Sequence, residues 1–564
     1  RTVDLDAGYF VLGEVVVGDG ASLDTRAGLG PTASLGAGAH LEPLAVVPSG
    51  SSLPALARAA GVPAQTVGSM PPGDRGPHEP ATSPPVDPRQ VTEGFDPVVH
   101  GLLTLLARSG LRWIAAAPWW AVLVGAVLLF DVDSDRVLSW LFAPHAWDLE
   151  VGLGLALGVV ALGPISLLWS ACLCRAMPTV TAGIVGRWTL RYLLVEAKIG
   201  AVEAAGRTLS GTMFWPAWLR LAGMRVGRGC EISTISGAVP ELCSFGEHVF
   251  FADGIYLGAP SCRQSLVQVG HTRLGPETFV GNHSVLPPGT SLDGGVLLGV
   301  CTVADERMTQ GTSWFGNPAF ALPRREIVEM DRSLTHEPGA AQVLSRLFWE
   351  CLRFLLPLWP LGAVLVWFKL MDQVERATGS PVLFFGVVLP VWLLATAALS
   401  LGWVWLLKWT LLGRVRPGQH GLWSCWASRW DFVYVAWQRW AAPVARVLEG
   451  SLLIAPWLRA MGVHVGKLCL LGRGFAQVVD PDMIHLHDGA TVACAFQAHS
   501  FEDRVLKIAP VHLGAHSTVA AGAVVMYGAR VREGAHVGHH SVIMKEEEIV
   551  GRVLGAPTRP VMRG

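Results

Sequence analysis

The sequence predicts a membrane protein in which tandem parallel β-helix domains alternate with pairs of transmembrane helices. Three observations predict this fold class. Aliphatic residues recur at every sixth position in three long series, and each series belongs to a larger unit that repeats along the chain. Between the series lie apolar segments of about 20 residues, the length that a helix needs to cross a bilayer.

Composition agrees with a membrane protein. Charged residues make up only 15% of the 564 residues, the mean hydropathy is +0.42, and the 23 tryptophans are typical of helices that end at a membrane interface. The net charge of −1 gives no electrostatic reason to expect nucleic acid binding. Ten cysteines without a C-x-x-C spacing indicate free thiols in a reducing compartment.

The period of six fits neither an amphipathic helix nor an alternating strand. It fits coils of short strands joined by tight turns, in which one aliphatic residue per turn faces inward and the strands stack in parallel. The series are Val11, Val17, Leu23, Leu29, Leu35, Leu41, Val47 and Leu53 in the first module; Leu274, Val280, Leu286, Leu292 and Leu298 in the second; and Leu513, Val519, Val525, Val531, Val537 and Ile543 in the third.

A longer repeat relates the three modules. Leu35, Leu274 and Leu513 open similar stretches that are 239 residues apart, and Pro118 in an apolar segment matches Pro357 at the same spacing. Each module is therefore predicted to be a helix pair followed by a β-helix. On this spacing the chain begins inside the first β-helix, so we expect it to be the C-terminal part of a longer polypeptide.

Four membrane spans are predicted, at Leu111–Phe130, Val151–Cys174, Leu352–Phe368 and Pro381–Leu407, and repeated Trp and Arg residues after each pair predict interfacial amphipathic helices. The predicted domains are residues 1–70 for the first β-helix module, N-terminally incomplete; 71–97 for a disordered linker; 98–206 for a transmembrane pair with amphipathic helices; 207–322 for the second β-helix module; 323–446 for a second transmembrane pair with amphipathic helices; and 447–564 for the third β-helix module.

Charge predicts the orientation. The loop after the first span is acidic, with Asp131, Asp133 and Asp135, whereas arginines and lysines flank the spans on the β-helix side. The positive-inside rule then places the protein in the cell membrane as a multi-pass protein with all β-helix domains in the cytoplasm.

These hexads resemble the hexapeptide-repeat acyltransferase superfamily, which implies left-handed β-helices of triangular section and a pseudo-trimer with sites between neighbouring β-helices. The whole arrangement resembles the C-terminal membrane and tandem acyltransferase-like region of ε-poly-lysine synthetase-type nonribosomal peptide synthetases. That resemblance implies as partners the membrane, carrier and adenylation domains of the same polypeptide, and an amino acid or short peptide acceptor, and it leaves a homo-oligomer open. It implies no directly bound cofactor but a phosphopantetheine-linked aminoacyl substrate, with ATP used by an adenylation domain that is absent from this sequence.

Candidate catalytic residues lie in the third module, in the stretch from His499 to Arg504. Amide formation needs a base to deprotonate the amine, and histidine is the usual one. We expect Glu502 or Asp503 to orient the His499 imidazole, and Arg504 to bind an acidic group of the substrate. The resembling acyltransferases carry an essential histidine in this kind of loop, and the synthetases have a similar His-x-x-Glu-Asp-Arg stretch.

Other candidates are weaker. Asp482 precedes the His499 stretch and would attract an amine substrate. The matching stretches of the first and second modules lack histidine, which predicts one active and two degenerate modules. We interpret His283, His516, His539 and His540 as solvent-facing turn residues, and no metal site is predicted.

The sequence thus predicts a membrane-bound acyltransferase-like region that forms amide or isopeptide bonds between carrier-bound aminoacyl groups and an amine acceptor, giving a homopoly(amino acid). Two alternatives stay open. One is an acetyl-CoA-dependent hexapeptide acetyltransferase, and the other is a non-catalytic scaffold or exit conduit. The scarcity of ionisable residues in the predicted spans argues against a polar conduit.

Overall fold

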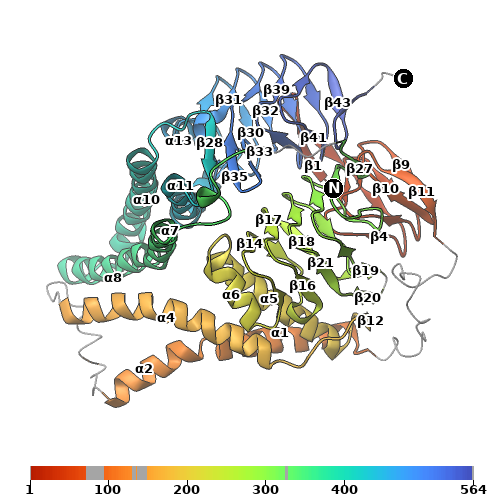
Figure 1. Cartoon of the computed structure of the whole chain (residues 1–564). Helices are drawn as coiled ribbons and strands as arrows, with labels where there is room; N and C mark the ends of the chain where they lie inside the picture. The colour runs from red at the N-terminus through yellow and green to blue at the C-terminus, as the bar shows by residue number, and fades with distance from the viewer. Residues whose placement is uncertain are drawn as a thin grey trace.

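The structure is a computed structural model that describes residues 2–70, 94–129, 135, 149–263, 265–323 and 328–561. Of the predicted linker, residues 71–93 lie outside the described residues, as do most of the acidic residues after the first predicted span. Three β-helical units and a set of projecting helices make up the described chain (Figure 1). We call each β-helical unit a prism, because its parallel strands form three sheets.

The first prism lies within residues 2–69 and contains only strands. They are β1 (Thr2–Asp6), β2 (Tyr9–Gly13), β3 (Val16–Val17), β4 (Ser22–Leu23), β5 (Gly28–Leu29), β6 (Ser34–Leu35), β7 (His40–Leu41), β8 (Val46–Val47), β9 (Ser52–Leu53), β10 (Ala57–Ala60) and β11 (Gln65–Ser69).

The strands of the second prism, with the outlying β12, are β12 (Gly183–Gly186), β13 (Arg225–Val226), β14 (Glu231–Ile232), β15 (Ile235–Ser236), β16 (Cys243–Phe245), β17 (Phe250–Phe251), β18 (Ile255–Leu257), β19 (Ser261–Arg263), β20 (Leu266–Val269), β21 (Thr272–Leu274), β22 (Phe279–Val280), β23 (Val285–Leu286), β24 (Ser291–Leu292), β25 (Leu297–Leu298), β26 (Ser313–Phe315) and β27 (Phe320–Ala321).

Those of the third prism, with the outlying β28, are β28 (Gly418–Gly421), β29 (His464–Val465), β30 (Leu470–Leu471), β31 (Ile484–Leu486), β32 (Thr491–Val492), β33 (Ala495–Gln497), β34 (His499–Glu502), β35 (Val505–Ile508), β36 (Val511–Leu513), β37 (Thr518–Val519), β38 (Val524–Met526), β39 (Arg530–Val531), β40 (His536–Val537), β41 (Val542–Ile543), β42 (Glu548–Ile549), β43 (Arg552–Leu554) and β44 (Arg559–Pro560).

The α-helices lie before the second and third prisms, and one short 3₁₀ turn lies inside each of these two prisms. They are α1 (Pro97–Ala115), α2 (Ala117–Leu129), α4 (Leu149–Ala176), α5 (Leu190–Leu209), α6 (Phe214–Leu221), α7 (Ala340–Leu352), α8 (Leu358–Thr378), α9 (Pro381–Leu383), α10 (Leu389–Leu411), α11 (Cys425–Ala436), α12 (Ala442–Leu448) and α13 (Ile454–Met461), with short 3₁₀ turns η2 (Pro240–Leu242), η3 (Arg332–Leu334), η4 (Arg353–Leu355) and η7 (Pro481–Met483) and π turns η5 (Phe384–Val388) and η6 (Trp437–Ala441).

The hexads produce the coils that the sequence predicts. Val17 pairs with Leu35, and Leu35 pairs with Leu53, so neighbouring strands of one sheet are one coil of three hexads apart. Aliphatic residues of the middle coils fill the prism interior, and Leu41 and Val519 are at most 1% exposed. Val11 differs from the prediction, because it lies in an antiparallel hairpin of β1 and β2 and is 37% exposed.

The spacing of 239 residues does not describe the first prism. Each prism ends at a hairpin with a cis proline; Pro318 and Pro557 are 239 residues apart, but Pro63 and Pro318 are 255 apart. The hairpins β1–β2, β19–β20 and β34–β35 show the same shift of the first prism by about one coil. A hexad pattern looks the same after a shift of one coil, so the sequence alone could not detect it.

Each hairpin contacts the next prism in a cyclic order. In the first prism, Ala7 N donates to Thr518 Oγ1 of the third (3.1 Å); in the second, Ser261 Oγ donates to Asp24 Oδ2 of the first (2.9 Å); and in the third, Arg504 donates to the Gly229 carbonyl of the second (2.5 Å). The three prisms also share one apolar cluster that contains Val46, Val285 and Val524. The prisms therefore pack against one another around a common centre.

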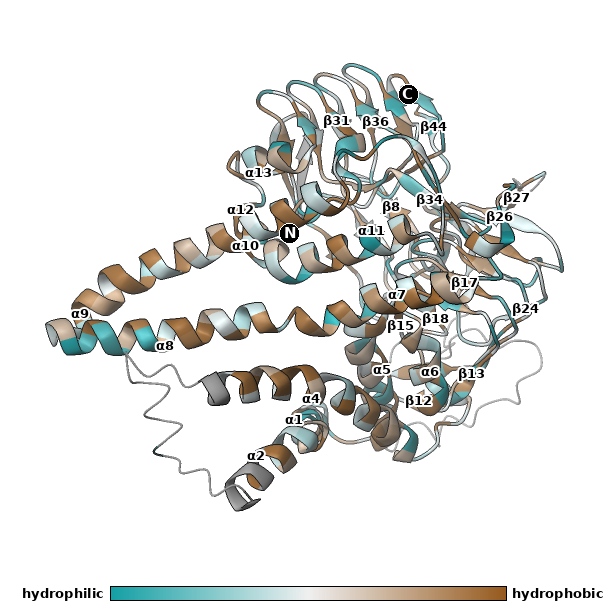
Figure 2. Cartoon of the chain, turned by 60° about the vertical axis from the view of Figure 1, so that its left-hand side comes forward, coloured by the Kyte–Doolittle hydropathy of each residue, from teal (hydrophilic) through white to brown (hydrophobic). Residues whose placement is uncertain are grey.

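Three helical stretches in the described part of the chain are long and apolar enough to cross a bilayer, which indicates membrane association: Gly152–Ala176, Ala340–Thr378 and Pro381–Leu411. Figure 2 shows α4, α8 and α10 projecting away from the prisms in one direction, coloured mostly as hydrophobic residues except at the hydrophilic outer end of α8.

The predicted span Leu111–Phe130 is not one helix, because α1 ends at Ala115 and α2 begins at Ala117. Pro118 has no N–H with which to continue the helix, which accounts for the break.

Two strands that the sequence pattern did not predict extend the hairpins. β12 pairs antiparallel with β20, and β28 pairs antiparallel with β35, although both strands lie in the segments predicted to be membrane and amphipathic helices. The hairpins of the second and third prisms thereby become three-stranded sheets beside their own prisms. In the third prism this sheet carries His499.

Candidate functional site

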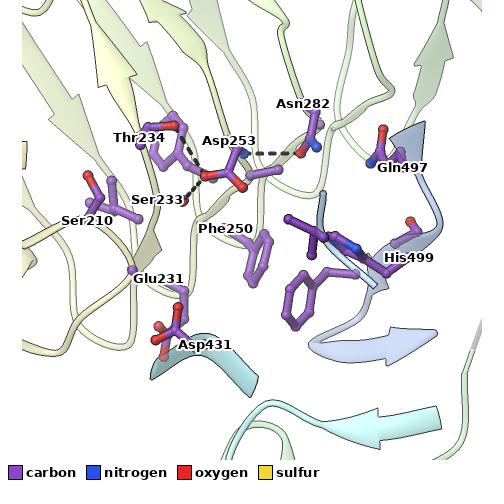
Figure 3. A pocket seen from close by; sticks show the side chains of 18 of the residues that line it. Ser210, Glu231, Ser233, Thr234, Phe250, Asp253, Asn282, Asp431, Gln497 and His499 are labelled. Atoms are coloured by element: carbon purple, nitrogen blue, oxygen red, sulfur yellow. Dashed lines mark hydrogen bonds between the residues drawn. The ribbon is translucent and has the colours of Figure 1, made fainter. Parts of the chain in front are cut away.

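A cavity of about 1110 Å³ lies between the second and third prisms. The second prism contributes Phe250 and Asp253, the hairpin of the third contributes His499 and Phe501, and helix α11 contributes Trp430. The rings of Phe250 and Phe501 meet across it with centroids 5.5 Å apart. Figure 3 shows His499 on one wall and Asp253 on another. The volume exceeds that of a typical single-ligand pocket, so two substrates can be accommodated together.

His499 is held by a buried carboxylate. Its Nδ1 lies 2.7 Å from Oδ2 of Asp480, whose side chain is 0% exposed. A carboxylate can only accept, so Nδ1 carries a proton, and in the neutral imidazole Nε2 then carries the lone pair. Nε2 has no hydrogen-bond partner among the described residues, and His499 lines the cavity. The arrangement is that of a general base oriented by a third group.

Neutral hydrogen-bonding groups complete the environment of Asp480. Trp430 Nε1 donates to Oδ1 (2.8 Å), and the Asp480 backbone N–H donates to the Tyr434 hydroxyl (2.8 Å). Burial raises the pKa of Tyr434 well above its usual value, so the phenol stays neutral. Trp430 also packs edge-to-face on the His499 ring, with centroids 5.1 Å apart. Within the described residues, Asp480 has no lysine or arginine at ion-pair distance, so its charge acts on the imidazole.

The structure does not place Glu502 against His499 as the sequence predicted. Glu502 pairs with Lys507 (2.7 Å) and with Lys545, and it accepts a hydrogen bond from Tyr527 (2.9 Å). Burial tends to raise the pKa of Glu502, but the hydrogen bonds from the two lysines outweigh burial and lower it to about 2. Glu502 is therefore a permanently charged carboxylate of the hairpin that lines another part of the cavity.

Asp503 and Arg504 occupy the turn of the hairpin. Asp503 lines the cavity but faces His336, with 3.5 Å between Oδ1 and Nε2. Arg504 is 4% exposed and donates to the backbone of the second prism, outside the lining of the cavity. The structure thus uses Arg504 to fix the hairpin to its neighbour, where the sequence suggested a contact with substrate.

Asp482 also lies outside the lining of the cavity. It lies 2.9 Å from Nζ of the fully buried Lys408 and accepts from Val415 N (3.0 Å). Its carboxylate is already neutralised, so the structure gives it no open position for an amine.

The turn histidines fall into two groups. His516 is exposed, as predicted, and its ring packs on Gly489 of the preceding coil. The prediction of solvent-facing turns is wrong for His283 and His540. They are partly buried where the prisms meet, and burial and nearby Arg26 lower the pKa of each to about 4.

Within the described ranges, no group of three or more His, Cys, Asp or Glu residues is placed to hold a metal ion.

Comparison with known proteins adds one relative. Over 375 residues this chain is 32% identical to the Delta-poly-L-ornithine synthetase of Acinetobacter baumannii (strain AB307-0294), a match that covers 64% of this chain. The chain is therefore similar to part of a poly(amino acid) synthetase, and it spans 28% of the length of that protein. No family model matches the sequence.

Among solved structures, serine acetyltransferase of Neisseria gonorrhoeae is 14% identical with a TM-score of 0.17, covering 42% of this chain and 94% of that one. Soybean serine acetyltransferase is 16% identical with a TM-score of 0.14, covering 42% of this chain and all (100%) of the other.

Sequence reasoning found His499 but missed Asp480. The two residues are 19 positions apart, and Asp480 lies in an irregular segment just before η7 rather than in a hexad. Its one local signal is the Asp480-Pro481-Asp482 triplet, in which the structure gives the two carboxylates different partners.

Proposed function

We propose that this chain is the membrane-bound, acyltransferase-like C-terminal region of a nonribosomal peptide synthetase, and that it joins carrier-bound aminoacyl groups to an amine acceptor through amide or isopeptide bonds. The observation that carries the proposal is the His499–Asp480 pair, which opens into a cavity large enough for donor and acceptor. Similarity to a poly(amino acid) synthetase supports repeated transfer, giving a homopoly(amino acid).

The chemistry follows from the free Nε2 of His499. Nε2 takes a proton from the acceptor amine as the nitrogen bonds to the thioester carbonyl carbon. The carbon–sulfur bond then breaks, and the departing thiolate takes that proton back from the imidazolium. The products are one amide and one pantetheine thiol. Asp480 holds the imidazole in the required tautomer and stabilises the imidazolium.

In this proposal the three prisms form a pseudo-trimer within one chain. The cyclic hairpin contacts and the shared cluster around Val46, Val285 and Val524 support it. Each hairpin then faces one cleft, and the cleft that contains His499 is the active one. A membrane position with the prisms in the cytoplasm would bring the site to the carrier domain, which delivers the phosphopantetheine-linked donor, while an adenylation domain uses ATP to load it.

The test uses the full chain, purified in detergent, with an aminoacyl-pantetheine thioester as donor and a free amino acid as acceptor. Amide product is measured by mass spectrometry. We expect His499→Ala to reduce the rate about 10²–10⁴-fold, the range for loss of a general base. His516→Ala, on an exposed turn of the same prism, is the matched control and should be unaffected.

An unchanged rate in His499→Ala would remove this residue from the mechanism. Transfer from acetyl-CoA in place of the aminoacyl thioester would favour an acetyltransferase instead.

A further inference from the structure

We propose that Arg207 and Arg439 form a binding site for a phosphate group, at the end of the cavity that lies away from His499. The inference rests on the proposed function and deepens it, because the phosphate that fits this position is the one on the phosphopantetheine arm of the donor. A phospholipid headgroup is a second source of the same chemical group.

Charge balance in the cavity singles out these two arginines. Five lysine and arginine side chains line the cavity, and three of them lie against carboxylates: Arg346 against Glu231 and Glu350, Arg353 against Asp431, and Lys545 against Glu502. Within the described residues, Arg207 and Arg439 have no carboxylate at ion-pair distance. An anionic ligand is therefore attracted to this end of the cavity.

The backbone of α5 holds Arg439 beside Arg207. Arg439 Nη2 donates to the Arg207 carbonyl oxygen at 2.7 Å and to Thr208 Oγ1 at 3.0 Å, so the guanidinium lies on the C-terminal turn of α5. These bonds use one nitrogen, and Nε and Nη1 have no hydrogen-bond partner among the described residues. An arginine fork with free donors matches the oxygens of a phosphate.

The two guanidinium groups repel each other when no anion is bound. Burial and the charge of Arg207 lower the pKa of Arg439, and within the described part of the chain no carboxylate counteracts them. Both side chains are exposed and line the cavity. A phosphate bound between them would relieve the repulsion and accept hydrogen bonds from both forks.

The separation from His499 matches the length of a phosphopantetheine arm. α11 and η6 form one continuous helix, because the backbone is helical at both Ala436 and Trp437. On this helix Arg439 follows Trp430 by nine residues, which is about 13 Å along the axis. The Trp430 ring contacts the His499 ring. The extended arm has about 13 bonds between phosphorus and sulfur, which span about 15 Å at the reach per bond of an extended chain.

The arginine end belongs to the cleft that contains His499. Figure 3 shows Ser210, three residues after Arg207, on the opposite side of the cavity from His499. The residue 239 positions before Arg439 is Gly200, so the second module has no arginine at the matching position. The phosphate site and the candidate base therefore occur together in the third module.

The experiment compares two donors on the purified full chain with one amino acid as acceptor. One donor is an aminoacyl-pantetheine thioester, and the other is the same thioester with a 4′-phosphate. We expect wild-type protein to prefer the phosphorylated donor by about 10- to 100-fold in kcat/KM, the effect of hydrogen bonds to a charged group.

The variants test which residues cause this preference. Arg207→Gln and Arg439→Gln should each reduce it towards equal use of the two donors, and Arg439→Lys, which keeps the charge, should retain part of it. Arg473→Gln removes an exposed arginine of the same module outside the cavity, so it should keep the wild-type preference. A preference that both glutamine variants retain in full would overturn the site.

A second measurement distinguishes the lipid source. Native mass spectrometry counts the phosphatidylglycerol molecules that stay bound to wild-type protein and to the double variant Arg207→Gln/Arg439→Gln. Equal use of the two donors by wild-type protein, with lipid lost from the double variant, would assign the phosphate to a headgroup. Equal use of the donors with equal lipid binding would overturn the site.

Failure of the proposed function is a separate result. If wild-type protein forms no amide from either donor, that function fails. The phosphate site is then decided by titration calorimetry, in which 4′-phosphopantetheine should bind about tenfold or more tightly than pantetheine does, and equal affinities would overturn it.

Discussion

Two hairpins of the same construction differ in what the buried carboxylates beside them bind. In the third prism, the hairpin that faces the second prism carries His499, and Asp480 contacts it directly. In the second prism, whose hairpin faces the first, Pro260 stands 239 residues before His499, and Glu241 is the middle residue of η2 as Asp482 is of η7. Glu241 lies 2.5 Å from Lys198 Nζ and accepts from Val180 N at 2.7 Å.

The third prism has two carboxylates here, one that contacts a lysine and one that contacts the histidine. Asp482 contacts a buried lysine, Lys408, and the backbone N–H of Val415, so it does there what Glu241 does in the second prism. Asp480, two residues earlier, is thereby left for the imidazole. A structural ion pair and the proposed catalytic pair can thus use the same scaffold, and the difference depends on one additional carboxylate.

The largest expected effect on the rate of amide formation comes from Asp480→Asn. The amide can donate to Nδ1 and so favours the wrong tautomer of His499, and it cannot stabilise the imidazolium. We expect kcat for amide formation to fall about 10²–10⁴-fold with little change in KM for the thioester. Glu241→Gln in the second prism should leave kcat per folded molecule unchanged, and an equal loss of kcat in both variants would contradict the assignment.

Lys408→Met tests the structural carboxylate. It leaves Asp482 as a buried charge without its cation, which typically costs about 3–5 kcal/mol of stability. The thermal midpoint in detergent should fall clearly, while the double variant with Asp482→Leu should recover part of it. The activity of the protein that remains folded should persist. Loss of activity at full stability would place Asp482 in the reaction after all.

The ion pairs of Glu502 are expected to make the stability of the protein depend on pH. Its pKa is lowered to about 2, so its ion pairs with Lys507 and Lys545 stabilise the fold above the unfolded-state value near 4.5. Glu502→Gln should cost about 2–3 kcal/mol at pH 7, and this cost should shrink as the pH falls from about 4.5 towards 2. Thermal midpoints of both proteins from pH 7 down to about pH 2.5 measure it. A cost that grew on acidification would contradict the sign.

The sequence was sufficient to predict the inward-facing residues, because the period of six determines them. Leu41 and Val519 face inward because each coil repeats the same contacts, and His499 emerged by comparing copies. Asp480 could not be predicted, because only coil stacking brings it to the hairpin. Arg504 looked like a substrate ligand because a charge pattern does not show which side of a hairpin meets another prism. The register of the first prism was missed because the pattern repeats with every coil.

The smallest expected effect comes from moving the histidine. In the His499→Ala background, Pro260→His places an imidazole at the matching position of the second hairpin. Its carboxylate, Glu241, is already bound to Lys198 and to a backbone N–H, so the new imidazole has no free acceptor for Nδ1. Amide formation should remain at the level of His499→Ala within about twofold. Pro260→His with His499 intact is the control, and it should keep the wild-type rate if the hairpin tolerates the change. Recovery of activity from the single transplanted histidine would show that a free carboxylate in the place of Asp480 is not what separates the two hairpins.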